Sequence, residues 1–309
     1  MGLTVLRTGP MTVLKDDGRP GHAAQGVAPS GAVDRSAYAR ANRLLGNPAG
    51  TAALECTLGG LRVRFDEPAT IVLTGTDAVL TVNGARTGTE EVVRVPAGAE
   101  VAVTVPRRGL RSYLAVRGGF DVPPVLGSRS TDPLAGIGPA RPAAGDVLPT
   151  GTPPAADDVP PSDPPPTADD VPPNDPRPVV AVVAAEAASV GGDGVLILAV
   201  DLGPRDDWFT PDAIDTFLSA EFRVALAGDS VGLRLDGPAL PRLRTDELPS
   251  EGVVRGSVQV PPSGHPIVFQ ADHPVTGGYP VIAVLTPAAA DLAAQARPGA
   301  AIRFTRTPD

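Results

Sequence analysis

Short stretches in which apolar and polar residues alternate follow one another through most of the chain. Between Leu61 and Arg117 each stretch ends at Gly, Pro or Asn, and the stretches are LRVRF, ATIVLTG, AVLTVNG, EVVRVPAG, EVAVTVP and RSYLAVRGG. A period of two residues is typical of half-buried β-strands, and the turn residues separate one strand from the next. This part of the chain is therefore predicted to be an antiparallel β-domain.

The second half repeats this pattern, with strands predicted at GVLILAV, GLRLDG, GSVQV, PIVFQ, PVIAVL and AIRF. Helices are predicted after Asp34, Thr210 and Thr286, whose side chains suit the N-cap position. Proline follows each threonine directly, and a proline at the first helical position lacks the amide donor that the first turn leaves unpaired. The first helix is predicted to stop at Gly46. We expect a mainly β fold with a few helices.

A proline-rich acidic tract separates the two halves and nearly repeats itself, as ADDVPPSDPPPT and then ADDVPPNDPRPV. Proline removes backbone donors and the tract has little to bury, so we predict an extended linker or insertion at residues 150–178. An N-terminal β-domain at 1–149 and a C-terminal β-domain at 179–309 flank it. The repeat is also compatible with a ligand for a polyproline-reading domain, which stays open.

Composition narrows the classes of partner. The 309 residues carry a net charge of -9, so the basic stripe that binds phosphate backbones is absent, and nucleic acid is not an expected partner. No apolar run approaches the roughly 20 residues needed to cross a bilayer, and the N-terminus shows no targeting signal. Cys56 is the only cysteine, which excludes an internal disulfide and fits a reducing compartment. We expect a cytoplasmic protein.

Several motifs have ordinary interpretations. GDSVG at 228–232 matches the nucleophile pattern G-x-S-x-G, but a predicted strand follows Ser230 where that motif requires a helix. No nucleotide P-loop occurs, and the histidines lack zinc-ligand spacing, so no metal site is predicted. His273 is either a general base beside Asp272 or a solvated turn residue. Cys56 lies in ALECTLGG, where a small buried side chain is the usual interpretation.

Polar clusters occur where predicted strands end. DDGRPG at 16–21 places carboxylates and an arginine at a glycine-rich turn, and APSGAVD at 28–34 leads into a helix N-terminus, which suits an anion. PSEG at 249–252, Gln259 and ADHPVTGGYP at 271–280 follow later. Each cluster alone is an ordinary turn. The combination of these clusters in one order along the chain is more specific than any single cluster.

These segments, with ANRLLGNPAGTAALECTLGG, LAVRGGFDVPPVLGSRSTD, DWFTPDAIDTFLS and LPSEGVVRGSVQVPPSGHPIVF, resemble the allophanate hydrolase subunit 2 family, also called the biotin-dependent carboxyltransferase family. The resemblance runs from about Val5 to Phe304, with the proline tract as an insertion. It implies two cyclophilin-like β-barrel domains. Within the family, the segments look most like the members that take part in ATP-dependent 5-oxoproline hydrolysis.

This resemblance implies a subunit of an ATP-dependent 5-oxoprolinase, which opens 5-oxoproline to glutamate with ATP hydrolysis and acts with a B subunit and a separate A subunit. The lactam is a resonance-stabilised amide, and phosphate on its oxygen makes it electrophilic, so the chemistry needs anion-binding donors and carboxylates. A requirement for Mg²⁺ stays open. Two alternatives remain: a carboxyltransferase component for urea or another amide, with biotin carried on another protein and none attached here, and a non-catalytic regulator that binds a kinase inhibitor.

The resemblance also implies site residues. Glu251, as base or metal-bridging carboxylate, and Asp272 are the catalytic candidates. The substrate-binding candidates are Arg19, Ser30, Glu55, Arg129, Gln259, Thr276, Gly277, Gly278 and Tyr279. The alternative is that most of these residues hold turns together. The chain departs from the family at Leu14-Lys15-Asp16-Asp17, at Pro274-Val275, and at Ser230, where an arginine is usual and offers a charge-assisted contact.

Overall fold

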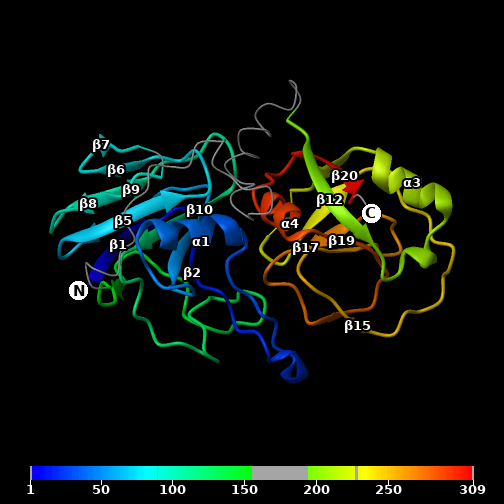
Figure 1. Ribbon diagram of the computed structural model, residues 1–309, viewed down its shortest axis with the longest axis horizontal. Helices are drawn as coiled ribbons and strands as arrows, with labels where there is room; N and C mark the ends of the chain where they lie inside the picture. The colour runs from blue at the N-terminus through cyan, green and yellow to red at the C-terminus, as the bar shows by residue number, and fades with distance from the viewer. Residues whose placement is uncertain (1, 89, 155–193, 227–228, 308–309) are drawn as a thin grey trace. The chain divides into compact units, whose positions relative to one another are not determined.

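The computed structural model describes residues 2–88, 90–154, 194–226 and 229–307. They form two compact β-rich units (Figure 1). The first unit takes residues 2–19, 34–131 and 136–154, and the second takes 20–33, 132–135, 194–226 and 229–307. The predicted linker at 150–178 lies, from residue 155 onward, outside the described residues, as does Gly228 of the GDSVG motif.

The first unit consists of two antiparallel sheets. The six-stranded sheet has the order β11 (Val147–Pro149), β1 (Gly2–Thr8), β4 (Leu61–Phe65), β9 (Glu100–Val103), β6 (Leu80–Val82), β7 (Ala85–Arg86). The five-stranded sheet has the order β2 (Met11–Lys15), β3 (Ala53–Thr57), β10 (Arg111–Val116), β5 (Ala69–Thr74), β8 (Val93–Val95). The antiparallel β-domain predicted between Leu61 and Arg117 is confirmed.

One apolar core fills the space between these two sheets. In β4 the predicted alternation is visible, because Leu61, Val63 and Phe65 are buried while Arg62 and Arg64 are exposed. The strand β10 is instead buried along its whole length, since helix α1 (Arg35–Leu44) packs against it. Burial on both faces removes the alternation that marks an ordinary antiparallel strand.

Helix α1 begins as predicted. The carboxylate oxygen Oδ1 of Asp34 accepts a hydrogen bond of 2.9 Å from the amide of Ala37, which satisfies one of the first-turn donors. Gly46 follows the last turn at φ +66°, in the left-handed region that favours glycine, and its amide donates to Arg43 O at 3.0 Å. The N-cap and the glycine stop are both local features, and both are confirmed.

The second unit is a closed barrel in the order β12 (Leu196–Leu202), β19 (Val281–Leu285), β16 (Ser257–Gln259), β17 (Ile267–Phe269), β14 (Gly232–Asp236), β13 (Phe222–Val224), β20 (Ala301–Arg306). All neighbouring strands are antiparallel except β12 and β20, which are parallel and close the barrel. A separate two-stranded ribbon pairs β15 (Glu251–Gly252) with β18 (Thr276–Gly277). The short 3₁₀ helices η1 (Ala23–Gln25) and η4 (Asp206–Trp208) complete the unit.

Two α-helices accompany the barrel, α3 (Pro211–Ser219) and α4 (Pro287–Ala293). Thr210 and Thr286 cap them through Oγ1, which accepts the amides of Ala213 at 3.1 Å and Ala289 at 3.2 Å. Both predicted helix starts are confirmed. The mainly β fold class is confirmed as well. Among the described residues, no helix is long and apolar enough to span a bilayer.

Candidate functional site

The loop from Gln270 to Tyr279, which we call the 270–279 loop, leaves the barrel after β17 and returns to it before β19. Its second half is fixed by the β15–β18 ribbon, in which Glu251 lies opposite Gly277 and the amide of Val253 donates to Val275 O at 3.1 Å. The ribbon therefore places Glu251 beside the end of the loop that carries Gly277, while Asp272 lies near its other end.

At the first end of the loop, Ser30 donates a short hydrogen bond from Oγ to Oδ1 of Asp272. Both side chains are fully buried, and the backbone amide of Asp272 donates to Ser230 O at 2.9 Å. Ser30 adopts φ +55° and Gly31 φ +99°. A serine in the left-handed region is uncommon, and such strain persists where surrounding contacts fix the conformation. The structure thus brings together two predicted site residues that lie far apart in sequence.

His273 follows this pair directly. Its ring is buried, at 3% exposed, and packs near Phe269 with ring centroids 6.1 Å apart. Its Nδ1 lies 2.7 Å from Pro274 O, and because a carbonyl oxygen only accepts, this nitrogen carries the hydrogen. The interpretation as a solvated turn histidine is therefore wrong. The general-base interpretation stays a prediction.

At the other end of the loop, Gln259 holds the backbone in place. Its Nε2 donates to Tyr279 O at 2.9 Å, and its side chain lies so close to Gly277 that any Cβ there would come within 3.0 Å of Nε2. A side chain at 277 would therefore force the Gln259 amide to move. Gly278 has no such neighbour, because the atom nearest to the position of an added Cβ is Leu248 O, at 3.7 Å. Tyr279 as a whole residue is 44% exposed.

Glu251 forms an ion pair with Arg205, a residue that the sequence interpretation missed. The Nε of Arg205 lies 3.1 and 3.0 Å from the two carboxylate oxygens, and Nη2 also donates to Oε1. This hydrogen bonding by Arg205 lowers the pKa of Glu251 below its usual range. A general base works best with a pKa near the operating pH. The geometry therefore favours an ionised, positioning carboxylate over a base.

Glu55 lies in the first unit, within a buried network. The Tyr113 hydroxyl donates to Glu55 Oε2 at 2.7 Å and accepts from the amide of Asp34 at 2.8 Å. Arg111 Nε lies 3.7 Å from Glu55 Oε1, and the Glu55 side chain is 3% exposed. Burial, followed by the charges of Glu55 and Asp34, raises the pKa of Tyr113 well above its usual range. These contacts tie α1 to β10 and β3, and favour the structural interpretation of Glu55.

Arg129 belongs to a second network in the first unit, centred on Asp16. The Oδ1 of Asp16 accepts the hydroxyls of Ser128 and Ser130, both at 2.6 Å, and Oδ2 accepts the amide of Arg129 at 2.5 Å. The sequence placed these residues in two separate turns, and the structure joins them around one carboxylate. The amide of Gly18 completes the set, donating to Oδ1 at 2.8 Å.

The arginine side chains of this region bind the backbone. Arg129 Nε donates to Val122 O at 2.7 Å and its Nη2 lies 3.2 Å from Asp121 Oδ1. Arg19 is only 1% exposed, and its Nη2 donates to Ser130 O. At the helix N-terminus where the sequence suggested an anion, the Asp34 carboxylate already accepts the Ala37 amide. These contacts stabilise turns.

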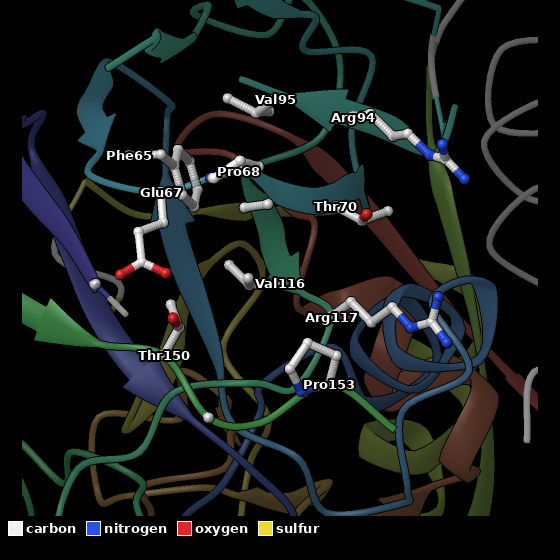
Figure 2. A pocket seen from close by; sticks show the side chains of 13 residues that line it. Phe65, Glu67, Pro68, Thr70, Arg94, Val95, Val116, Arg117, Thr150 and Pro153 are labelled. Carbon is white, nitrogen blue, oxygen red and sulfur yellow. The ribbon is translucent and has the colours of Figure 1, made fainter. Parts of the chain in front are cut away.

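A cavity of about 270 Å³ lies elsewhere in the first unit. In Figure 2, Phe65, Val95 and Val116 form its apolar wall, while Glu67 and Arg117 lie on opposite sides. None of the predicted site residues lines it. Among the described residues, no group of three or more His, Cys, Asp or Glu is arranged to hold a metal ion.

The closed barrel and the polar 270–279 loop, together with the matching motifs, define a protein of the carboxyltransferase-domain class. The chain matches the family model for the carboxyltransferase domain, subdomains A and B, over residues 25–306, and it belongs to this family. The family predicted from the motifs is confirmed.

Relatives of known name differ greatly in length. The chain is 35% identical to the C subunit of 5-oxoprolinase from Escherichia coli (strain K12), and the match covers 98% of this chain and 91% of that protein. It is 30% identical to the urea amidolyase of Lachancea kluyveri, over 97% of this chain but 16% of that enzyme. The crystal structure of the K. lactis urea amidolyase superposes with a TM-score of 0.84 at 28% identity, covering 99% of this chain and 19% of the larger one.

Proposed function

We propose that this chain is a subunit of a cytoplasmic, ATP-dependent 5-oxoprolinase, a hydrolase that opens the lactam of 5-oxoproline to glutamate. The observation that carries the proposal is the similarity to the C subunit of the Escherichia coli 5-oxoprolinase, which is 35% identical over 98% of this chain. The urea amidolyase of Lachancea kluyveri is 30% identical over 97% of this chain. The name of the bacterial relative implies further subunits.

The 270–279 loop supplies groups that suit this chemistry. A lactam carbonyl that is activated by phosphate develops negative charge when water attacks it, and such charge is stabilised by donors fixed in a buried site. Asp272 is a fully buried carboxylate that accepts the Ser30 hydroxyl, so the role that suits it is to take a proton from the attacking water rather than to stabilise the developing charge. We assign Asp272 a catalytic role, and we assign Glu251 the role of fixing Arg205.

The chain shows no P-loop, and its described residues hold no cluster of acids for a metal ion. We therefore propose that ATP is bound together with another protein of the assembly. Homologues of the A and B subunits are the expected partners. The single buried Cys56 is compatible with a reducing, cytoplasmic location.

A second candidate function is the carboxyltransferase half-reaction of a urea or amide carboxylase. The observation that favours it is the TM-score of 0.84 to the K. lactis urea amidolyase. In that case the biotin is carried outside these 309 residues, because the side chain that carries biotin in such enzymes is a lysine, and the one lysine here, Lys15, is fully buried in β2. A biotin carrier protein that co-purifies with the chain supports this alternative.

The test is co-expression with homologues of the A and B subunits, followed by measurement of ATP hydrolysis with 5-oxoproline, urea and allophanate. We expect hydrolysis that depends on 5-oxoproline and on the presence of this chain. Asp272 is fully buried, so Asp272→Asn is first checked for folding by the fluorescence of Trp208, and the folded variant is expected to lose the substrate-dependent rate. Asp236→Asn, at an exposed position of β14, leaves the rate unchanged. If ATP hydrolysis in the full assembly does not respond to 5-oxoproline, the proposed function is wrong.

A further inference from the structure

Arg242 is a partly buried cation that has no acidic partner among the described residues. Its Nη2 donates to Val260 O, and its Nε is buried without a hydrogen-bond partner in the part of the chain that the structure describes. Among the described residues, no carboxylate oxygen lies within 4.0 Å of a nitrogen of the Arg242 guanidinium, the distance that defines an ion pair. Burial lowers the pKa of Arg242, and only Tyr279 offsets this effect. The guanidinium carbon lies 5.9 Å from the centroid of the Tyr279 ring.

Comparable arginines of the second unit have acidic partners. Arg205 binds Glu251, and Arg255 binds Asp291 in a pair that is less than a tenth exposed. Arg244, two residues from Arg242, also lies over an aromatic ring, but Asp246 is 3.4 Å away.

In the first unit, Arg19 also has a guanidinium nitrogen, Nη1, without a hydrogen-bond partner. That side chain is only 1% exposed, so no ligand reaches it from solvent. Arg242 differs because it is only half-buried, and its neighbour Tyr279 is 44% exposed.

A cation that is partly removed from water without an anion costs free energy, and a ligand anion that binds there recovers it. Two features at and next to Tyr279 leave room for such a ligand. The exposed ring of Tyr279 offers a flat face, and Gly278 carries no side chain and has no atom nearer than 3.7 Å to a Cβ position. The backbone of Tyr279 is fixed as well, because Gln259 Nε2 donates a hydrogen bond to the Tyr279 carbonyl oxygen.

We propose that Arg242 and Tyr279 form a subsite for the carboxylate of a small planar ring, with the carboxylate on the guanidinium and the ring on the tyrosine. Resting on the proposed function, this subsite selects the anionic lactam 5-oxoproline over neutral amides such as urea. A phosphate of ATP is the other source of an anion for Arg242, and the experiment separates the two.

The experiment compares Arg242→Gln with Arg244→Gln in the full assembly. Arg244→Gln removes a neighbouring arginine that also lies on a ring but has its own carboxylate. We expect Arg242→Gln to raise KM for 5-oxoproline about 10- to 100-fold, the loss typical of one charge-assisted hydrogen bond, with a smaller change in kcat. Inhibition by 2-pyrrolidinone, the same ring without the carboxylate, and KM for ATP should stay as in the wild type. Arg244→Gln should change none of these values.

Several outcomes overturn the subsite. They are an unchanged KM for 5-oxoproline in Arg242→Gln, an equal loss of 2-pyrrolidinone inhibition, an equal effect of Arg244→Gln, or a rise confined to KM for ATP. Arg242→Lys keeps the charge and serves if Arg242→Gln does not fold. We expect it to retain the fold and to give an intermediate KM, because an ammonium lacks the planar fork of the guanidinium.

The subsite and the proposed function can fail separately. If the assembly shows no 5-oxoproline-dependent ATP hydrolysis, the function is wrong, and the full chain is then titrated with 5-oxoproline while the ligand is observed by NMR. Binding to the wild type that weakens at least tenfold in Arg242→Gln supports the subsite. Absence of binding to the wild-type chain overturns it.

Discussion

Replacement of Gly277 by alanine tests whether the 270–279 loop is as rigid as its contacts indicate. An added Cβ lies closer than 3.0 Å to Gln259 Nε2, 3.0 Å from Cδ and 3.1 Å from Oε1. The Gln259 amide must therefore move. It is only 3% exposed, and the same Nε2 donates to Tyr279 O at 2.9 Å, so the movement breaks the contact that fixes the end of the loop.

Two costs add to the loss of stability. Forcing an extra methyl group into a packed site costs about 1 to 3 kcal/mol, and a buried amide that loses its partner costs about 1 to 3 kcal/mol. Because movement of Gln259 relieves part of the overlap, we expect a total of about 2 to 4 kcal/mol. Gly278→Ala is the matched control. Its Cβ meets only Leu248 O, at an ordinary 3.7 Å, so we expect a change within about 0.5 kcal/mol.

Urea unfolding followed by the fluorescence of Trp208 measures both variants. Trp208 is the single tryptophan of the chain and lies buried in the second unit, so its signal reports on the unit that contains the loop. A double variant, Gln259→Ser with Gly277→Ala, should lose less stability than the sum of the two single changes, because the serine removes the overlap. If Gly277→Ala is as stable as Gly278→Ala, the packing argument is refuted.

Three further predictions concern titrating groups. Arg205 lowers the pKa of Glu251 below 4.5, so the unfolded state binds more protons on acidification, and the stabilisation present above pH 4.5 is lost as the pH falls through the folded pKa. The difference in urea midpoint between wild type and Glu251→Gln should therefore shrink from pH 7 to pH 3, and a constant difference contradicts the ion pair. Burial and the charge of Asp16 raise the pKa of Asp17 above 3.8, so the native state binds this proton more tightly and stability falls as the pH rises through the folded pKa. Asp17→Asn should raise Tm at pH 7 and raise it less at pH 3. An equal rise in Tm at the two pH values argues against the raised pKa of Asp17. Burial raises the pKa of Cys56 to about 12, so a thiol reagent at pH 8 should label it only at the rate of unfolding, and rapid labelling of the native chain is the contrary result.

The elements of the fold could be predicted because their signals are local. An alternation of apolar and polar residues fixes which face of β4 is buried, and a threonine followed by proline fixes where α3 and α4 begin. The closure of the barrel is not local. It depends on parallel pairing of β12 with β20, in which Leu196 lies beside Ile302, and no pattern within either strand specifies that partner.

The candidate site was predictable in part for the same reason. The glycines and polar residues of the 270–279 loop stand together in sequence, so their proximity in space required no tertiary information. The interaction of Ser30 with Asp272 joins positions 242 residues apart, and within the sequence only the resemblance to a family groups them. The sequence interpretation missed Arg205 and Arg242, because a sequence does not show which groups lie close to an arginine side chain in the folded protein. Neither carries a sequence signal that could have found it.

A residue that recurs in a family motif is not thereby a substrate contact, and the carboxylates of this chain show why. Asp16 accepts two hydroxyls and two amides, three of these donors on Oδ1 and one on Oδ2. Glu55 is enclosed by Arg111 and Tyr113. Replacement of either carboxylate leaves several buried donors without a partner, so such variants lose stability before they report on chemistry. The contacts of Asp16 and Glu55 therefore favour structural roles for both carboxylates, and mutational tests of the reaction belong on the 270–279 loop.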